Sequence, residues 1–307
     1  MAKRDPPERP ALQLGAAWPR PSKGGARPAI TKKARSSKAI KLPSARSNYS
    51  PAIKSSADSD SASQVAARRA ALIALNEDRV PFVVAGAYAM REYTSIRRDT
   101  KDLDIFCRRK DAGRALTSLA RVGFRVEMTD SLWLAKGFAE NGEFVDVIFS
   151  SGNGVAEVDE LWLRRARKAR VLGVDSLIAP PEEMIWSKSY VQERERYDGA
   201  DIQHLLLWCA ESLDWKLLLD RMRPHPEVLL AHLLLFRFSY PGDRDKIPAW
   251  VLDELIALSR RPALPSEKRL CRGTLLSGRQ YEIDLAEGYR DARPLEVPAW
   301  REHREPP

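Results

Sequence analysis

The chain has 307 residues, which is enough for one large domain or two modest ones. Apolar residues make up 44% of the sequence, so a core can form, and this excludes a wholly disordered protein. No segment approaches the roughly 20 apolar residues of a membrane-spanning helix, and the N-terminus lacks the apolar block of a secretory signal. Three distant cysteines without a Cys-x-x-Cys pair argue against disulfides and a zinc site. We therefore expect a cytoplasmic protein that does not contact a membrane.

The formal net charge of +9 is concentrated at the N-terminus. Residues 1–54 hold thirteen lysines and arginines and only two acids, Asp5 and Glu8, so the rest of the chain is close to neutral. Residues 1–64 are rich in Pro, Ser, Lys, Ala and Gly and have no apolar period, so we expect a disordered tail. Its charge either serves solubility or holds nucleic acid weakly through counterion release.

From residue 64 the pattern alternates between amphipathic helices and short apolar strands. Arg68 and Arg69 interrupt the apolar face of the first helix. Asn141-Gly142 predicts a hairpin, because both residues tolerate a positive φ. The expected helices are 64–78, 87–93, 111–123 and 157–169, and the expected strands are 80–86, 101–106, 124–129, 132–138, 143–149 and 171–179.

From Pro181 onward the apolar period is helical. The expected helices are 181–195, 198–210, 214–222, 226–239 and 248–260. The sequence therefore predicts an α+β fold in which a mixed sheet flanked by helices is followed by a helical domain. Its four parts are a disordered basic tail (1–64), a mixed α/β domain (65–179), a helical domain (180–261) and a C-terminal extension (262–307).

Two further groups of residues have a structural and a functional interpretation. His232 lies on the very apolar face of the helix 226–239, where a buried, hydrogen-bonded histidine is favoured over a ligand. A basic run on the expected helix 157–169 is interpreted first as a solvated face and second as a surface that holds an anionic acceptor. The run consists of Arg164, Arg165, Arg167, Lys168 and Arg170.

Asp102 and Asp104 stand two residues apart on the expected strand 101–106. Their side chains share one face of the strand, while Leu103 and Ile105 point into the core. Two carboxylates about 7 Å apart repel each other in a dry site, and a divalent cation removes that penalty. Mg²⁺ favours one or two carboxylates together with phosphates and water. Taken alone, such a pair is also common on exposed strands.

A third acid, Asp146, lies in the middle of the apolar strand 143–149. An acid in this position is costly unless a cation compensates its charge. That cation is either an arginine from a helix or a metal ion. Together with Asp102 and Asp104, Asp146 predicts a metal site.

Gly86 ends a buried strand and opens a short helix. A glycine there lets the backbone approach a phosphate, and the helix N-terminus offers free N–H groups and a positive potential. Taken alone, a glycine at a strand–helix junction is commonly just a turn residue.

The glycine, the Asp-x-Asp pair and the third aspartate occur in an order that resembles the nucleotidyltransferase superfamily, which includes DNA polymerase beta and kanamycin nucleotidyltransferase. That family has a strand ending in Gly-Gly or Gly-Ser, then an Asp-x-Asp strand, then a third Asp on a following strand. Here these are Gly86-Ala87, Asp102-Leu103-Asp104 and Asp146. VPFVVAGAYAMREY and RRDTKDLDIF look like the bacterial stand-alone branch of minimal nucleotidyltransferases and abortive-infection toxin relatives. Lys188 and Asp198-Gly199-Ala200-Asp201 look like the Lys and Asp-x-x-Asp that recur there.

The resemblance covers about residues 79–207. It implies a transferase that uses Mg²⁺ to move a nucleoside monophosphate from an NTP such as ATP to an acceptor hydroxyl, releasing pyrophosphate. The implied acceptor is a tRNA, a protein or a small molecule. The implied catalytic residues, which would also hold two Mg²⁺ ions, are Asp102, Asp104 and Asp146. The implied nucleotide-binding residues are Gly86, Ala87, Tyr88, Lys101 and Lys188.

Ala87 departs from the family pattern, because a serine hydroxyl is missing at this position. Its backbone N–H is still able to hold a phosphate. The departure nevertheless supports an alternative hypothesis, in which the chain is a non-catalytic relative that binds a nucleotide or a partner protein.

Overall fold

The computed structural model describes residues 62–98, 100 and 102–293, and the structural statements that follow concern this part of the chain. Nearly all of the expected tail lies outside the described residues, as does Lys101. No helix in the described ranges is long and apolar enough to cross a membrane. The cytoplasmic location stays a prediction.

A mixed sheet of seven strands has the order β3-β4-β5-β2-β1-β7-β6. β2 runs parallel to β5 and β1 runs parallel to β7, whereas the other neighbouring pairs are antiparallel. The strands are β1 (Val83–Val84), β2 (Asp102–Phe106), β3 (Arg125–Asp130), β4 (Leu134–Phe138), β5 (Phe144–Ile148), β6 (Arg167–Val171) and β7 (Val174–Ile178).

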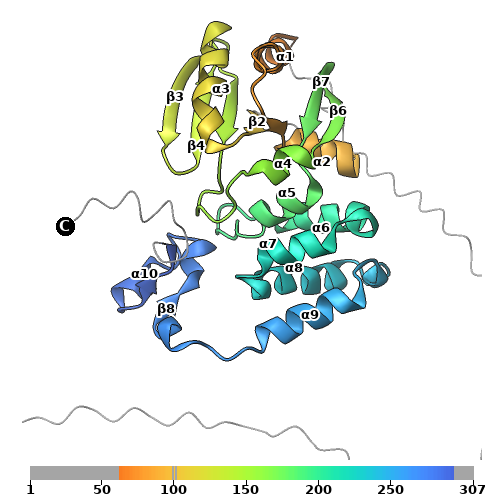
Figure 1. Ribbon diagram of the computed structural model, residues 1–307, viewed down its shortest axis with the longest axis vertical. Helices are drawn as coiled ribbons and strands as arrows, with labels where there is room; N and C mark the ends of the chain where they lie inside the picture. The colour runs from red at the N-terminus through yellow and green to blue at the C-terminus, as the bar shows by residue number, and fades with distance from the viewer. Residues whose placement is uncertain (1–61, 99, 101, 294–307) are drawn as a thin grey trace, which may run out of the picture. The chain divides into compact units, whose positions relative to one another are not determined.

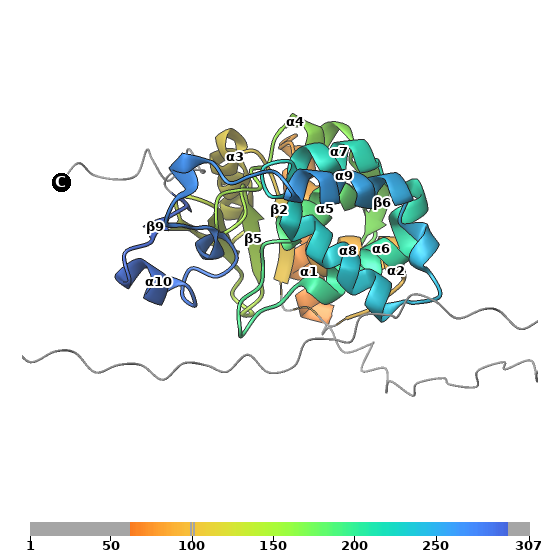
Figure 2. The same ribbon diagram turned by 90° about the horizontal axis from the view of Figure 1, so that it is seen from below.

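Helices accompany the sheet and then follow it (Figure 1). Those within the sheet region are α1 (Ala62–Glu77), α2 (Gly86–Thr94), α3 (Arg109–Arg121) and α4 (Glu160–Arg164). Those that follow are α5 (Pro181–Lys188), α6 (Gly199–Cys209), α7 (Trp215–Met222), α8 (Pro226–Ser239) and α9 (Ala249–Ser259). α1 packs against α3, α2 against α6, and α8 against α6, α7 and α9. The helices α5 to α9 lie together beside the sheet in both views (Figure 1 and Figure 2).

The C-terminal extension contains short elements only. These are β8 (Leu270–Cys271), α10 (Glu282–Ala286) and β9 (Arg290–Asp291), with β8 parallel to β9. Single 3₁₀ turns are η1 (Ala210–Ser212), η2 (Arg244–Lys246), η3 (Pro265–Glu267) and η4 (Arg272–Leu275). The α+β class and the mixed sheet with flanking and following helices are confirmed, whereas the boundaries of the four parts stay predictions.

One expected helix is wrong over most of its length. Only Glu160–Arg164 of 157–169 is helical, and Arg167–Val171 forms the edge strand β6. The hairpin between β6 and β7 turns at Leu172 and Gly173, which both have positive φ angles, 49° and 75°. Pairing with β7 therefore overrides helix propensity. Of the basic run, Arg164 ends α4 and Arg165 follows it, whereas Arg167, Lys168 and Arg170 lie on β6. Lysine and arginine on an edge strand protect it from further strand pairing.

Two other expected elements are shorter than the sequence predicts. β1 is only Val83–Val84, and the helix expected at 181–195 ends at Lys188. The helix 226–239 and the strands around the Asn141-Gly142 hairpin agree with the sequence to within two residues. Asp102, Asp104 and Asp146 thus fall on strands as expected.

Arg68 shows how an apolar helix face accommodates an arginine. Its side chain is 1% exposed, and its Nε donates to Oε2 of the buried Glu143 at 2.7 Å. The same guanidinium donates to the Tyr88 hydroxyl at 2.9 Å and to the Thr100 carbonyl at 2.8 Å. A buried ion pair therefore ties α1 to the start of β5 and to the segment before β2.

We expect Arg68→Met to lower the free energy of unfolding by about 3–5 kcal/mol, because Glu143 then stays buried without this guanidinium. The double variant Arg68→Met/Glu143→Gln should lose less, since it buries no such charge. Urea unfolding of both variants and the wild type measures the difference. A double variant less stable than the single one would contradict this account of the pair.

His232 has the buried position expected from the sequence. It is 1% exposed, and its Nε2 donates to the Ser189 carbonyl at 3.0 Å, immediately after α5. Burial lowers the pKa of His232, against a smaller opposite effect of this hydrogen bond. His232 therefore stays neutral at a pH at which a solvated histidine begins to take up a proton.

Below about pH 6.5 the unfolded chain binds a proton at His232 more readily than the folded chain. The stability that His232 contributes should therefore fall as the pH drops from about 6.5, by up to about 1.4 kcal/mol per pH unit. Urea unfolding at pH 7.5 and pH 5.5 should show His232→Met less stable than the wild type at the higher pH. The gap should narrow at the lower pH, and a constant gap would contradict the buried neutral state.

Candidate active site

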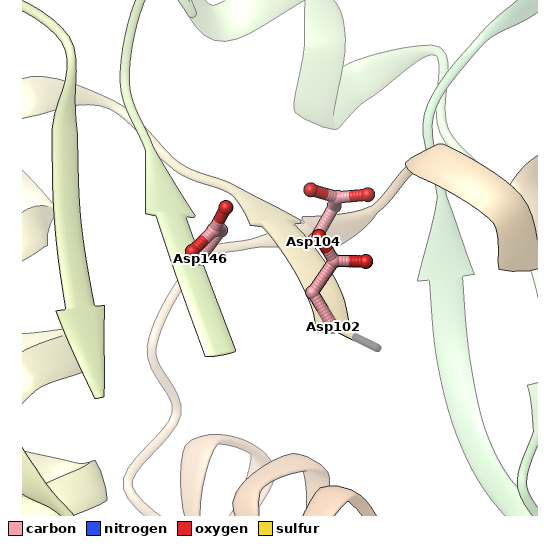
Figure 3. Close-up of side chains that lie close together, drawn as sticks. All are labelled: Asp102, Asp104 and Asp146. Atoms are coloured by element: carbon pink, nitrogen blue, oxygen red, sulfur yellow. The ribbon is translucent and has the colours of Figure 1, made fainter. Parts of the chain in front are cut away.

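Three aspartates meet on one face of the sheet. β2 and β5 are adjacent and parallel, and their register pairs Asp104 directly with Asp146. One carboxylate oxygen from each of Asp102, Asp104 and Asp146 lies within 4.8 Å of the others. Figure 3 shows the two side chains of β2 and the one of β5 around a shared space. The three acids that the sequence assigns to catalysis are thus brought together.

Two of the three carboxylates have a protein partner on one oxygen. Thr100 Oγ1 donates to Asp102 Oδ1 at 2.5 Å, and Lys136 Nζ donates to Asp146 Oδ1 at 2.6 Å. Lys136 lies on β4, opposite Asp146 in the antiparallel register. Asp146 therefore has a lysine partner from a neighbouring strand, where the sequence left a helical arginine or a metal ion open.

Lys136 was not among the site residues expected from the sequence, although the sequence carries a signal for it. Lys136 and Asp146 lie equally far on either side of Asn141 in the predicted hairpin. Counting outward from that turn places the two residues opposite each other and on the same face.

Burial and like charge disturb the ionisation of the cluster. Burial, followed by the charges of Asp102 and Asp146, raises the pKa of Asp104 to about 7, against opposing effects of Lys188 and Arg196. Burial also raises the pKa of Asp146, although Lys136 works in the opposite direction. Oxygen donors this close, with too few positive charges around them, suit a hard divalent cation.

Gly86 is the first residue of α2 and lies against Asp104. Its φ is +54°, and a Cβ placed on it would come within 1.7 Å of Asp104 Oδ2. The preceding amide, of Ala85, donates to the Asp104 carbonyl at 3.0 Å. Only glycine fits here, because the left-handed backbone and the close carboxylate both exclude a side chain.

We expect Gly86→Ala to displace the Asp104 carboxylate and to weaken Mn²⁺ binding at least tenfold, measured by isothermal titration. The matched control is Gly113→Ala, because Gly113 is exposed on α3 and a Cβ there meets nothing within 4 Å. That control should bind Mn²⁺ as the wild type does and gain about 1 kcal/mol of stability. Equal Mn²⁺ affinity in the two variants would contradict the role of Gly86.

Lys188 lies at the end of α5 and holds the start of α6. Its Nζ is 2.8 Å from Asp198 Oδ2 and 2.9 Å from Asp201 Oδ2, and Arg98 is paired with Asp201 at 2.8 Å. Burial works to lower the pKa of Lys188, and the two aspartates outweigh it, so the pKa is raised. Asp198 occupies the N-cap position of α6, but its side chain caps no backbone amide and bonds to Lys188.

A cavity of about 390 Å³ adjoins the cluster. Gly86, Asp104 and Lys188 are among its lining residues. The cavity lining therefore includes two of the expected nucleotide-binding residues together with one of the acids. The Tyr88 hydroxyl is directed to Arg68 instead, and Ala87 follows Gly86 in the first turn of α2.

No protein-family model matches the sequence, and no curated protein matches it. Solved structures do match. ANT(2″)-Ia in complex with adenylyl-2″-tobramycin is 19% identical, with 58% of this chain and 99% of that chain covered and a TM-score of 0.36. The lincosamide antibiotic adenylyltransferase LnuA, bound to lincomycin, is 14% identical, with 46% and 94% covered and a TM-score of 0.35.

An antigenic nucleotidyltransferase-like protein from Paracoccidioides brasiliensis is 13% identical, with 56% of this chain and 93% of that chain covered and a TM-score of 0.33. The chain is thus similar to these three solved structures at 13–19% identity. At these identities the likeness concerns the arrangement of the chain and not its activity.

Proposed function

We propose that the chain is a nucleotidyltransferase that moves a nucleoside monophosphate from an NTP to an acceptor hydroxyl and releases pyrophosphate. The observation that carries the proposal is the convergence of Asp102, Asp104 and Asp146 within 4.8 Å, on adjacent parallel strands. A cavity large enough for a small ligand begins at Asp104. Metal-assisted phosphoryl transfer needs this combination of clustered carboxylates and adjoining space.

The donor set fits Mg²⁺, which Asp102, Asp104 and Asp146 would hold through their oxygens. When bound, the ion neutralises phosphate charge and polarises the oxygens around phosphorus. Thr100 and Lys136 each occupy one carboxylate oxygen and orient the acid they bind. Two ions are expected from the family resemblance, and Lys136 already supplies one positive charge beside Asp146.

The chain's own groups would bind the triphosphate. The N-terminus of α2, at Gly86 and Ala87, offers backbone N–H groups beside the cluster. Lys188 uses two of its three ammonium protons to bind Asp198 and Asp201, which fixes the position of the ammonium group. The third proton is left to donate to a phosphate oxygen. The missing hydroxyl at Ala87 removes one hydrogen bond and leaves these groups in place.

A second candidate function is nucleotide or partner binding without turnover. Ala87 favours it, and so does the ion pair between Lys136 and Asp146, which occupies a carboxylate that catalysis would use. The basic tail, as a contact for nucleic acid, lies outside the described residues and stays a prediction.

Asp104→Asn is the sharpest test of catalysis. It keeps the shape of the side chain, removes a charge from the cluster and should lower the rate of pyrophosphate release from labelled NTPs by on the order of 10³-fold. The matched control is Asp175→Asn, an exposed aspartate on β7, which should retain the wild-type rate. Wild-type turnover by Asp104→Asn would refute the assigned role.

Titration with a non-hydrolysable MgATP analogue, followed by a pyrophosphate-release assay with MgATP itself, separates the two candidates. Binding without pyrophosphate release, across protein, tRNA and small-molecule acceptors, would support the second function. Failure to bind any Mg-nucleotide would contradict catalysis and nucleotide binding, and would leave partner binding as the second function.

A further inference from the structure

Charged residues form a row across four strands of the sheet. Asp104 on β2 pairs with Asp146 on β5, which pairs with Lys136 on β4. Lys136 pairs in turn with Glu127 on the edge strand β3. Directly paired residues point to the same side of a sheet, so all four side chains share the face that carries the acids. Lys136 therefore lies between two acidic neighbours, and its ammonium group binds the one that belongs to the cluster.

Two contacts hold the side chain of Lys136 at Asp146. Its Nζ donates to Asp146 Oδ1 at 2.6 Å and lies 4.6 Å from the centroid of the Phe144 ring, whose face attracts a cation. The side chain of Lys136 is 21% exposed and that of Asp146 is 14% exposed, so water and salt screen this pair only weakly. Moving the ammonium group away would break both contacts and leave Asp146 without this cation.

Glu127, the other acidic neighbour of Lys136, is compensated by a different cation. Arg125 is paired with Glu127 at 2.8 Å, and its guanidinium lies over the Phe138 ring, 4.4 Å from the centroid. The side chain of Glu127 is 43% exposed, so water also stabilises its charge. Glu127 therefore needs the ammonium group of Lys136 less than Asp146 does.

The carboxylate oxygens of the cluster suit a single ion. Thr100 binds one oxygen of Asp102 and Lys136 binds one oxygen of Asp146, so each of these acids has one oxygen that neither donor occupies. Ligands of one octahedral Mg²⁺ lie about 3–4 Å from one another, because each is about 2 Å from the ion. One oxygen from each of the three acids, all within 4.8 Å, therefore reaches a shared ion after a small shift.

A second ion would have to bind beside the ammonium group of Lys136. The two ions of a two-metal site are only about 3.5–4 Å apart, so both contact the same cluster of carboxylates. A lysine already compensates Asp146, and it would repel another cation at this acid. Mg²⁺ also gives up its bound water reluctantly, so it gains little from a carboxylate that is already paired.

We propose that this chain binds one divalent ion at the cluster, and that the ammonium group of Lys136 takes the place of a second ion beside Asp146. The inference rests on the proposed function, for which the family resemblance implies two ions. Lys136 is thus a positioning residue. It compensates the charge of Asp146 and fixes the orientation of this carboxylate, so that the other oxygen is presented to the single ion.

The test counts Mn²⁺ ions on the full-length chain in the presence of α,β-methylene-ATP, by equilibrium titration and by electron paramagnetic resonance. The wild type should bind one Mn²⁺ per chain and give the spectrum of an isolated ion. Lys136→Met should bind two, and their spectrum should show coupling between neighbouring ions, because Asp146 is then open to a metal. Lys136→Arg should return the count to one, since arginine restores the positive charge.

A control and a stability measurement separate this role from a merely structural one. The matched control is Lys168→Met, an exposed lysine on the edge strand β6, which should bind one Mn²⁺ as the wild type does. Without Mn²⁺, the urea midpoint of Lys136→Met should lie below that of the wild type. The gap should close at saturating Mn²⁺, because the second ion binds only the folded chain. A gap that Mn²⁺ leaves unchanged would show a structural role alone and would overturn the proposal.

The remaining outcomes distinguish this inference from the proposed function. Two coupled Mn²⁺ ions on the wild type, or a single ion on Lys136→Met, would overturn the inference and leave the proposed function standing. A wild-type count of two that Glu127→Gln lowers to one would also overturn it, because Lys136 then moves to Glu127 when the second ion binds. If the chain binds neither Mn²⁺ nor the nucleotide analogue, the proposed function fails, and the inference fails with it.

Discussion

Asp102, Asp104 and Asp146 repel one another because two parallel strands hold their carboxylates on one face of the sheet, within 4.8 Å. The backbone register prevents them from moving apart, so the surroundings must compensate the charge. Thr100 donates to one acid and Lys136 to another, while the third has a pKa of about 7. Much of the surrounding architecture, from the glycine at the start of α2 to the lysine on β4, follows from this constraint.

The site has two chemically different ends. At one end, carboxylates, a helix N-terminus and a fixed ammonium group suit phosphates and a hard cation. At the other end, the stacked rings of Phe106 and Trp162 make the site more apolar. Asp104 lines the cavity where the two environments join.

Local patterns were enough to predict the strands that carry the acids. Alternation placed Asp102 and Asp104 on one face, and Asn141-Gly142 predicted the hairpin that leads to Asp146. The sequence could not show that Arg68 finds a buried partner in Glu143, because no local pattern joins residues so far apart. β6 was missed for the same reason, since pairing with a neighbouring strand outweighed its helical composition.

The ion pair of Arg68 also bears on how the protein folds. Arg68 and Glu143 are 75 positions apart, and the same guanidinium holds the Thr100 carbonyl, whose residue donates to Asp102. Contacts of such long sequence separation form slowly, because a large loop must close before they gain any energy. The segment before Asp102 is therefore held in place by a contact of long sequence separation, so we expect the geometry of the acidic cluster to depend on the docking of α1.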